Sequence, residues 1–180
     1  MARKMAKYFI TVAILFFIAG CFEGIMFPTK FRFQFFYAAF MHIPPEHLKS
    51  FFSHFVVKIH THISLVGWVT SALMGILYFI VPQIKDQAKG RERYSKWACY
   101  ANFWLHVFGI LLFCVGFHLI GMTGLKSGYA PGSPEFRELE TPFKLFVLTG
   151  GSFICLSSLL FSLNIEKTLF ATETSKDHNG

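Results

Sequence analysis

Long apolar runs separated by short polar segments dominate this chain, and four of the runs are long enough to cross a lipid bilayer. An α-helix rises about 1.5 Å per residue, so about 20 apolar residues span the roughly 30 Å of hydrocarbon. The pattern predicts an all-α membrane protein, a bundle of four transmembrane helices in a single domain of residues 1–165. We place the four spans near residues 8–27, 57–81, 97–122 and 143–163. The polar segment 166–180 is predicted to be a tail outside the membrane.

The segment between the first two spans is rich in aromatic residues and is not typical of a simple loop. Residues 31–40 read FRFQFFYAAF, Pro44 and Pro45 interrupt the pattern, and residues 46–55 read EHLKSFFSHF. Aromatic residues broken by a few basic or polar ones favour a helix that lies in the membrane interface. We therefore predict short interfacial helices here; the alternative is a loop packed on neighbouring subunits. Residues 123–142 contain the Gly, Pro and Ser of an irregular connection.

The composition supports a membrane protein and changes how the net charge is interpreted. Hydrophobic residues make up 53% of the chain, charged residues make up 15%, and the formal net charge is +7. The mean hydropathy is +0.47. Many of the basic residues flank apolar runs, where they act as topology signals rather than as a nucleic-acid-binding surface. They precede the first span (Arg3, Lys4, Lys7) and follow the second (Lys85, Lys89, Arg91, Arg93, Lys96).

The distribution of these basic residues predicts the orientation of the chain. Cytoplasmic loops carry an excess of Lys and Arg, so we predict that both termini are cytoplasmic, in a bacterial-type inner membrane. The connections 28–56 and 123–142 then lie on the external side, as does the end of the second span that carries His60. The basic loop 85–96 is predicted to be exposed and suited to anionic lipids. We expect no nucleic-acid partner.

The cysteines do not indicate a disulfide framework. Each lies in or at the edge of an apolar run, and none forms a C-x-x-C pair, so we predict small buried hydrophobic residues. They are Cys21, Cys99, Cys114 and Cys155. Residues 18–21, IAGC, also resemble a lipoprotein cleavage site. In that alternative Cys21 is lipidated and three spans remain; we favour an uncleaved first span.

Histidines provide the main candidate chemistry, because ionisable residues inside a membrane are costly and tend to be functional. Imidazole is also a common metal and haem ligand. In HTHISLVGWVTSALMGILYFIVP, His60 and His62 face roughly opposite ways on a helix that turns about 100° per residue. His60 shares its face with Ser64, Gly67 and Ser71, and small residues mark where another helix, or a flat ring, comes close. His60 is therefore the better ligand candidate, and His62 is a weaker one that instead snorkels to the interface.

The third span offers His106 and His118 as further ligand candidates. His106 lies on a stripe with Asn102 and Gly109, which indicates an inward-facing side chain. His118 lies near the external end, close to the depth of His60, because the second and third spans run antiparallel. Two axial ligands of one haem need similar depths when the ring stands along the membrane normal, so we favour His60 with His118 over His106. The alternative for either third-span histidine is a purely structural role, in which the imidazole forms a hydrogen bond with a backbone carbonyl or a neighbouring hydroxyl.

The second span resembles the second transmembrane helix of the catalytic subunit (subunit I) of haem–copper oxidases and of their nitric oxide reductase relatives. In that family a histidine at the external mouth of this helix is an axial ligand of low-spin haem. The helix then continues through G-W and M-G pairs to an aromatic pair and a proline. The matching residues here are His60, Gly67, Trp68, Met74, Gly75, Tyr78, Phe79 and Pro82. The third span, NFWLHVFGILLFCVGF, is similar to the family's next helix, though less specifically.

The resemblance implies a truncated, four-span relative of that subunit, because it covers residues 60–120 well and the flanks weakly. Helices that carry the second low-spin ligand, the high-spin haem ligand and the copper histidines have no counterpart here. Reduction of oxygen or nitric oxide by this chain alone is therefore not expected. The resemblance implies a haem b-binding subunit that transfers electrons within a larger respiratory complex. His60 is then one axial ligand, and His118 or a residue of a partner chain is the other.

Two other interpretations stay open. In the first, the chain is a cofactor-free structural or assembly subunit that docks through its external aromatic loop. In the second, Glu23 and the external histidines handle a quinol or a metal ion; these histidines are His42, His47 and His54. The expected partners are membrane lipids and other subunits or further copies of the chain, with a quinol or a cytochrome as redox partner.

Overall fold

Helices make up almost all of the structure. The computed structural model describes residues 1–26, 32–85 and 94–170, and it contains no strand within those ranges. The α-helices are α1 (Ala2–Ile25), α2 (Arg32–Phe40), α3 (Leu48–Phe51), α4 (Val57–His62), α5 (Ser71–Lys85), α6 (Lys96–Lys126) and α7 (Pro134–Leu169). A 3₁₀ turn, η1 (Pro45–His47), precedes α3. Two π-helical segments, η2 (Phe52–Val56) and η3 (Ile63–Thr70), join α3, α4 and α5 into one continuous rod.

Four helical rods are long and apolar enough to cross a membrane, which confirms the predicted all-α, four-span fold class. They are Ala2–Ile25, Pro45–Ile84, Lys96–Lys126 and Pro134–Leu169. The short helix α2 occurs where the aromatic segment predicted one. The chain is non-helical at Ile43 and Pro44, as the proline pair indicates, because a proline disfavours helical backbone in the residue before it.

The helices extend beyond the predicted spans at several ends. α6 continues to Lys126 and α7 begins at Pro134, so the irregular connection predicted for residues 123–142 is much shorter. α7 also continues to Leu169, into the segment predicted as a tail. With 36 residues α7 is about 54 Å long, well beyond the roughly 30 Å of a bilayer core. Hydropathy marks the part of a helix that suits hydrocarbon, whereas the helix itself continues into water.

Two local signals begin α7 earlier than the hydropathy pattern predicts. The Ser133 hydroxyl accepts a hydrogen bond from Phe136 N at 3.1 Å and so caps the first turn. Pro134 occupies that turn, where a missing N–H removes no helical hydrogen bond. The same Ser and Pro that suggest a loop are therefore the N-terminus of a helix.

Some predictions fall on residues that the structure does not describe. These residues are Lys89, Arg91 and Arg93 of the basic loop, and most of the tail, residues 171–180. The exposed lipid-facing loop and the polar tail therefore stay predictions.

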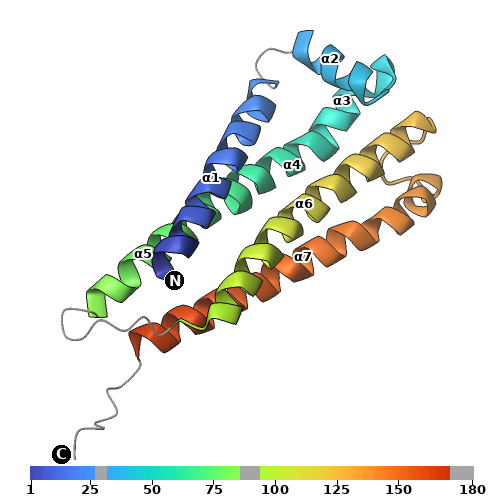
Figure 1. Ribbon diagram of the computed structural model, residues 1–180. Coiled ribbons are helices and arrows are strands. Elements are labelled where there is room, and N and C mark those ends of the chain that lie inside the picture. Colours follow the sequence, from blue (N-terminus) through green and yellow to red (C-terminus); the bar gives the residue numbers. More distant parts are fainter. Residues whose placement is uncertain (27–31, 86–93, 171–180) are drawn as a thin grey trace, which may run out of the picture.

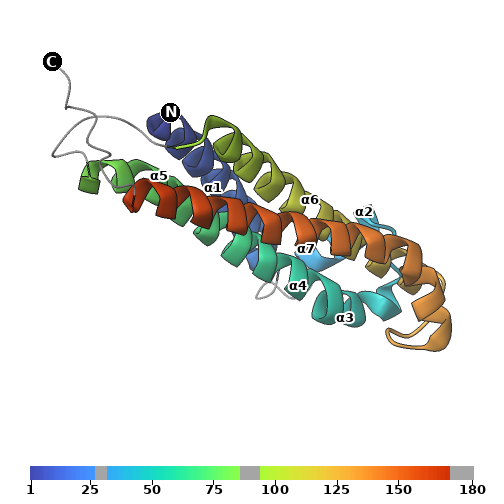
Figure 2. The same cartoon turned by 90° about the horizontal axis from the view of Figure 1, so that it is seen from below.

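The four rods form two antiparallel pairs that lie side by side. α1 packs along the rod from α4 to α5, and α6 packs along α7 (Figure 1). A second view shows α2 and α3 at one end of the bundle, while α1 begins and α7 ends at the other (Figure 2). We call these ends the α2 end and the N-terminal end.

The α6–α7 pair is held by close backbone approach at glycine. A Cβ placed on Gly150 would lie 2.6 Å from the Gly109 carbonyl oxygen and 2.7 Å from Phe113 N. A Cβ placed on Gly109 would lie 2.9 Å from the Gly150 carbonyl oxygen. The two backbones therefore touch with no side chain between them. Lipid is as apolar as leucine, so close packing of this kind drives helix association in membranes.

Large apolar side chains cover the outer surface, as expected for helices that face lipid. On α1, Ile14, Leu15 and Ile18 are each more than half exposed, as are Leu145 and Leu163 on α7. Buried positions instead include several polar side chains: Ser71, Asn102, His106, Ser157 and Asn164. This distribution supports a membrane-embedded bundle, in which polar groups avoid the lipid face.

We expect Gly150→Ala to destabilise the detergent-solubilised protein by about 1–3 kcal/mol, because the added methyl forces two touching backbones apart. Gly151→Ala is the matched control, since a Cβ there meets nothing within 4 Å and alanine favours a helix. Thermal unfolding of the two variants checks this. Equal shifts in both would contradict a tight α6–α7 contact at Gly150.

Candidate functional site

The helix that carries His60 and His62, α4, lies between two π-helical segments. In a π-helix each hydrogen bond spans five residues instead of four, and such turns are frequent at functional sites. Side chains beyond η3 are therefore rotated from the positions that an uninterrupted α-helix would give them. Regular spacing alone does not place the residues of this rod.

His60 lies near the α2 end, partly buried, with its ring against α1. A Cβ placed on Gly24 would lie 3.2 Å from His60 Cε1 and 3.9 Å from Nε2. The imidazole therefore sits in a cradle that any side chain at position 24 would fill. The structure brings this ligand candidate to the surface between α1 and α4.

The small residues that share the face of His60 pack against α1. A Cβ placed on Gly20 would lie 3.0 Å from Ser64 Oγ, and one placed on Gly67 would lie 2.8 Å from Phe16 Cγ. The sequence left open whether a helix or a flat ring approaches this stripe. In the structure the neighbour is the helix α1, and Phe16 fills the space over Gly67.

His62 faces away from His60, toward α6, as the two-residue spacing predicts. Its Nδ1–H donates to the Lys58 carbonyl at 2.7 Å, and its ring centroid lies 4.2 Å from that of Phe113. A carbonyl that accepts from Nδ1–H leaves the lone pair on Nε2, which is the tautomer a metal ligand needs. His62 thus has a suitable tautomer, but it lies on the opposite side of α4 from His60.

His118 is held at both ring nitrogens. Its Nδ1–H donates to the Cys114 carbonyl at 3.0 Å, so Nε2 is the acceptor, and it accepts from the Tyr37 hydroxyl of α2. Burial, the nearby Glu23 carboxyl and the Cys114 thiol raise the pKa of Tyr37. The phenol therefore stays protonated and able to donate. In this structure the lone pair that a metal would use is already engaged.

His118 lies near the depth of the second rod's histidines, as the antiparallel arrangement predicts. Lys58 Nζ lies 5.5 Å from the ring centroid of Phe117, the residue before His118. The two favoured ligands nevertheless have different neighbours, since His60 faces α1 and His118 bonds to Tyr37. A haem held by these two histidines of one chain would require the Tyr37 hydroxyl to leave and α1 to move.

His106 is fully buried between the two helix pairs. Its Nε2 hydrogen bonds with Ser71 Oγ at 2.9 Å, and its ring centroid lies 5.9 Å from that of Phe9. Ser71 is also fully buried and turns toward α6, away from the α1-facing stripe on which the spacing placed it. His106 thus makes the contact that a structural role predicts, a hydrogen bond between the imidazole and a neighbouring hydroxyl.

A second buried polar group lies one turn along α6 from His106, around Asn102, which the sequence placed on the inward-facing stripe without indicating its partners. Asn102 Nδ2 donates to the Ser157 carbonyl at 2.9 Å and to its Oγ at 2.8 Å. The Tyr78 hydroxyl donates to Asn102 Oδ1 at 3.0 Å, so the group ties α5, α6 and α7 together. The signal was present, because polar residues such as Asn102 and Ser157 within apolar runs need buried partners.

The residues proposed for a metal site of the external segment are not brought together. His42 and His54 are exposed, and each bonds to a carbonyl of its own segment; His47 belongs to η1. Glu23 is 8% exposed and lies near Tyr37. In the part of the chain that the structure describes, no group of three or more His, Cys, Asp or Glu side chains could hold a metal ion. The arrangement does not support the metal-handling interpretation.

Comparison with known proteins decides the family. Residues 3–154 match the family described as cytochrome c and quinol oxidase polypeptide I. The chain belongs to this family. A cytochrome c oxidase subunit 1 homolog from Azorhizobium caulinodans is 28% identical over 129 residues, which are 67% of this chain and 23% of that relative. The chain thus spans less than a quarter of the relative's length. No solved structure gives a significant match.

In this member of the oxidase polypeptide I family, we expect Tyr37→Phe to loosen α2 from the membrane rods. The change removes the donor to His118 Nε2 and leaves a buried acceptor unsatisfied, at a cost of about 1–3 kcal/mol. Amide hydrogen exchange across residues 32–40 should accelerate. Tyr129→Phe is the matched control, because Tyr129 is an exposed tyrosine in the α6–α7 connection. Unchanged exchange of α2 in Tyr37→Phe would show that the bond does not anchor this helix.

Proposed function

We propose that the chain is a haem b-binding integral membrane subunit that transfers electrons within a larger respiratory complex. Membership of the cytochrome c and quinol oxidase polypeptide I family supports a haem as the cofactor. Within the chain, His60 is the axial ligand. The position of His60 on α4, with its ring in the Gly24 cradle of α1, is the observation that carries this proposal.

The contacts of the other membrane histidines support the choice of His60. His106 is fully buried against Ser71, and His118 is bonded at both nitrogens. His62 has a ligand tautomer but packs on Phe113. His60 is partly exposed, and its ring packs against Gly24 of α1, where the absence of a side chain makes room for it.

A haem between two histidines of a single chain does not fit this packing. Phe16 fills the stripe over Gly67, and Tyr37 occupies the Nε2 atom of His118. We therefore propose that the second axial ligand comes from another chain, either a second copy or a larger subunit. This chain then supplies one axial ligand and apolar surroundings of low dielectric, and it sets the depth of the haem in the membrane.

The residues around His60 would contribute by holding its imidazole in place. Gly24 makes room for the imidazole beside α1, and the contact of Ser64 with Gly20 holds the second rod against α1 so that the ring keeps its orientation. When bound, the haem supplies one-electron chemistry, and its potential depends on axial ligation and burial. A quinol or a cytochrome is the proposed redox partner. We also propose that both termini are cytoplasmic, because Arg3, Lys4 and Lys7 begin α1.

A cofactor-free structural subunit is the second candidate, and one feature of α2 favours it. Phe36 and Phe40 on this helix are 72% and 74% exposed, which leaves an aromatic face uncovered at the α2 end. A partner subunit could dock there while the small-residue stripe serves only the packing of α1.

We expect the protein purified with haem to show a Soret band that His60→Ala abolishes, because the variant removes the only axial ligand proposed for this chain. His62→Ala is the matched control, since it removes an imidazole from the same helix on the opposite face, and should leave the band in place. Oxidised and reduced absorption spectra, together with the haem-to-protein ratio, provide the measurement.

Size-exclusion chromatography and thermal unfolding of each variant separate ligand loss from misfolding. A haem-supplemented preparation that is folded and co-purifies with a larger assembly, but shows no Soret band, would exclude the haem proposal and support the structural subunit. A Soret band that survives in His60→Ala and disappears in His118→Ala would show that His118, and not His60, is the axial ligand.

A further inference from the structure

A groove runs between α1 and α5 near the N-terminal end of the bundle, far from the histidines of the α2 end. Its volume is about 510 Å³, within the roughly 300–1,000 Å³ that is usual for ligand sites. It is lined by Arg3, Ala6, Lys7 and Ile10 of α1 and by Gly75, Ile76, Phe79 and Ile80 of α5. The feature belongs to neither function proposed above.

Small residues create the floor of this groove. A Cβ placed on Gly75 would lie 3.0 Å from Ile10 Cγ1 and 3.2 Å from the Ala6 carbonyl oxygen. Gly75 and Ala6 thus bring the two backbones together without filling the space above them. Ile76 and Phe79 rise beside the floor and are 43% and 46% exposed. The result is an apolar trough that faces the surrounding lipid.

Two cations stand at the rim of the trough. Arg3 and Lys7 are exposed and lie four residues apart on α1, so they are about 6 Å apart along the helix. Among the residues that the structure describes, neither makes an ion pair, and no acidic side chain lines the groove. An apolar trough with unpaired cations at one end matches a molecule with an apolar chain and an anionic head.

We propose that this groove binds one anionic glycerophospholipid. The lipid phosphate lies between Arg3 and Lys7, and an acyl chain follows the trough past Phe79 toward Gly75 and Ile10. Basic sites between transmembrane helices at the membrane surface suit anionic lipid heads, and the position of both cations in the first turns of α1 provides that geometry. An apolar helix of another protein is a poorer match, because packing it into the groove would bury Arg3 and Lys7 without a negative partner unless that helix carried acidic side chains.

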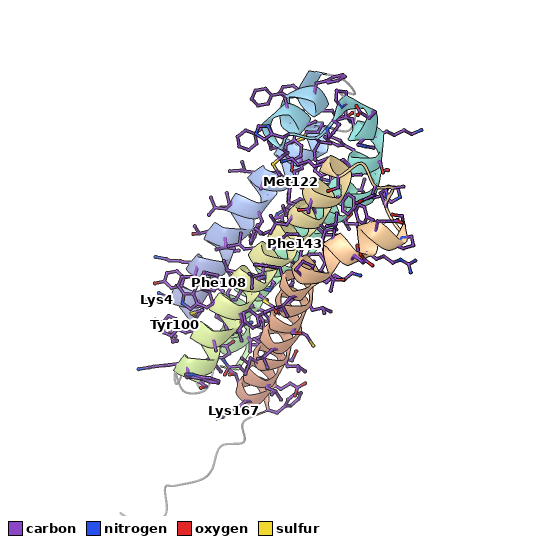
Figure 3. The ribbon with its side chains drawn as sticks, turned by 90° about the vertical axis from the view of Figure 1, so that its right-hand side faces the viewer. Lys4, Tyr100, Phe108, Met122, Phe143 and Lys167 are labelled. Atoms are coloured by element: carbon purple, nitrogen blue, oxygen red, sulfur yellow. The ribbon has the colours of Figure 1, made fainter. Side chains whose placement is uncertain are left out.

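Lys4 provides a matched control for the rim. It lies on the same turn and carries the same charge, but its Nζ lies 5.6 Å and 5.7 Å from the ring centroids of Tyr8 and Tyr100, on the α6 side. Figure 3 shows Lys4 beside Tyr100. General attraction of the N-terminal end to an anionic membrane would involve Lys4 as much as Lys7, whereas a site in the groove would not.

The test is native mass spectrometry of the full chain, titrated in detergent with phosphatidylglycerol or with phosphatidylcholine of the same acyl chains. We expect the chain to retain one tightly bound phosphatidylglycerol molecule and to bind phosphatidylcholine more weakly. Each removed rim charge should weaken binding about fivefold, so Arg3→Gln with Lys7→Gln should weaken it about 25-fold. Lys4→Gln should bind phosphatidylglycerol as the unmodified chain does.

A second pair of variants tests the trough with every charge retained. Ile76→Trp fills the groove and should weaken phosphatidylglycerol binding, whereas Leu77→Trp, at an exposed neighbour outside the lining, should not. Unchanged binding in Ile76→Trp would overturn the proposal, as would equal losses in Lys4→Gln and Lys7→Gln or equal affinity for the two lipids. Melting temperatures measured without added lipid verify that the compared variants are equally folded.

Discussion

Close backbone contact at small residues is the constraint on which this structure depends. Helices in a bilayer gain no hydrophobic energy by associating, so they associate where their backbones can touch. α6 and α7 meet at Gly109 and Gly150, and α1 meets the second rod at Gly20, Gly67 and Gly75. The same kind of contact sets both proposed sites, since the His60 ring packs against Gly24 of α1, while Gly75 forms the floor of the lipid groove.

Satisfaction of buried polar groups is the second constraint, and it separates the histidines from one another. A buried polar atom without a partner costs about 1–3 kcal/mol, and no water is available in hydrocarbon. Ser71 supplies a partner for Nε2 of His106, and both ring nitrogens of His118 are held by Tyr37 and Cys114. A metal at Nε2 of either histidine would first require an existing hydrogen bond to break.

Hydropathy predicted the four rods because the length and the apolar content of a span are local properties. The histidine contacts were less predictable, because a contact with another rod depends on rotation about the helix axis. The π-helical turns of η3 alter that rotation, and Ser71 accordingly faces His106 rather than the stripe of His60. Spacing could show that something approaches Gly67, but not that it would be Phe16. The start of α7 could have been predicted from Ser133 and Pro134, because the capping of a helix depends only on residues close together in the sequence.

The two ends of the bundle present different chemistry to their surroundings, and this difference indicates what each end can bind. The N-terminal end has two exposed cations, Arg3 and Lys7, over an apolar trough, a combination that a lipid satisfies without any specific protein surface. The α2 end has a partly exposed His60 and the exposed rings of Phe36 and Phe40. The proposed haem on His60 needs a second axial ligand in a defined orientation, which mobile lipids do not supply. Under that proposal, the α2 end is therefore where another protein chain would complete the site.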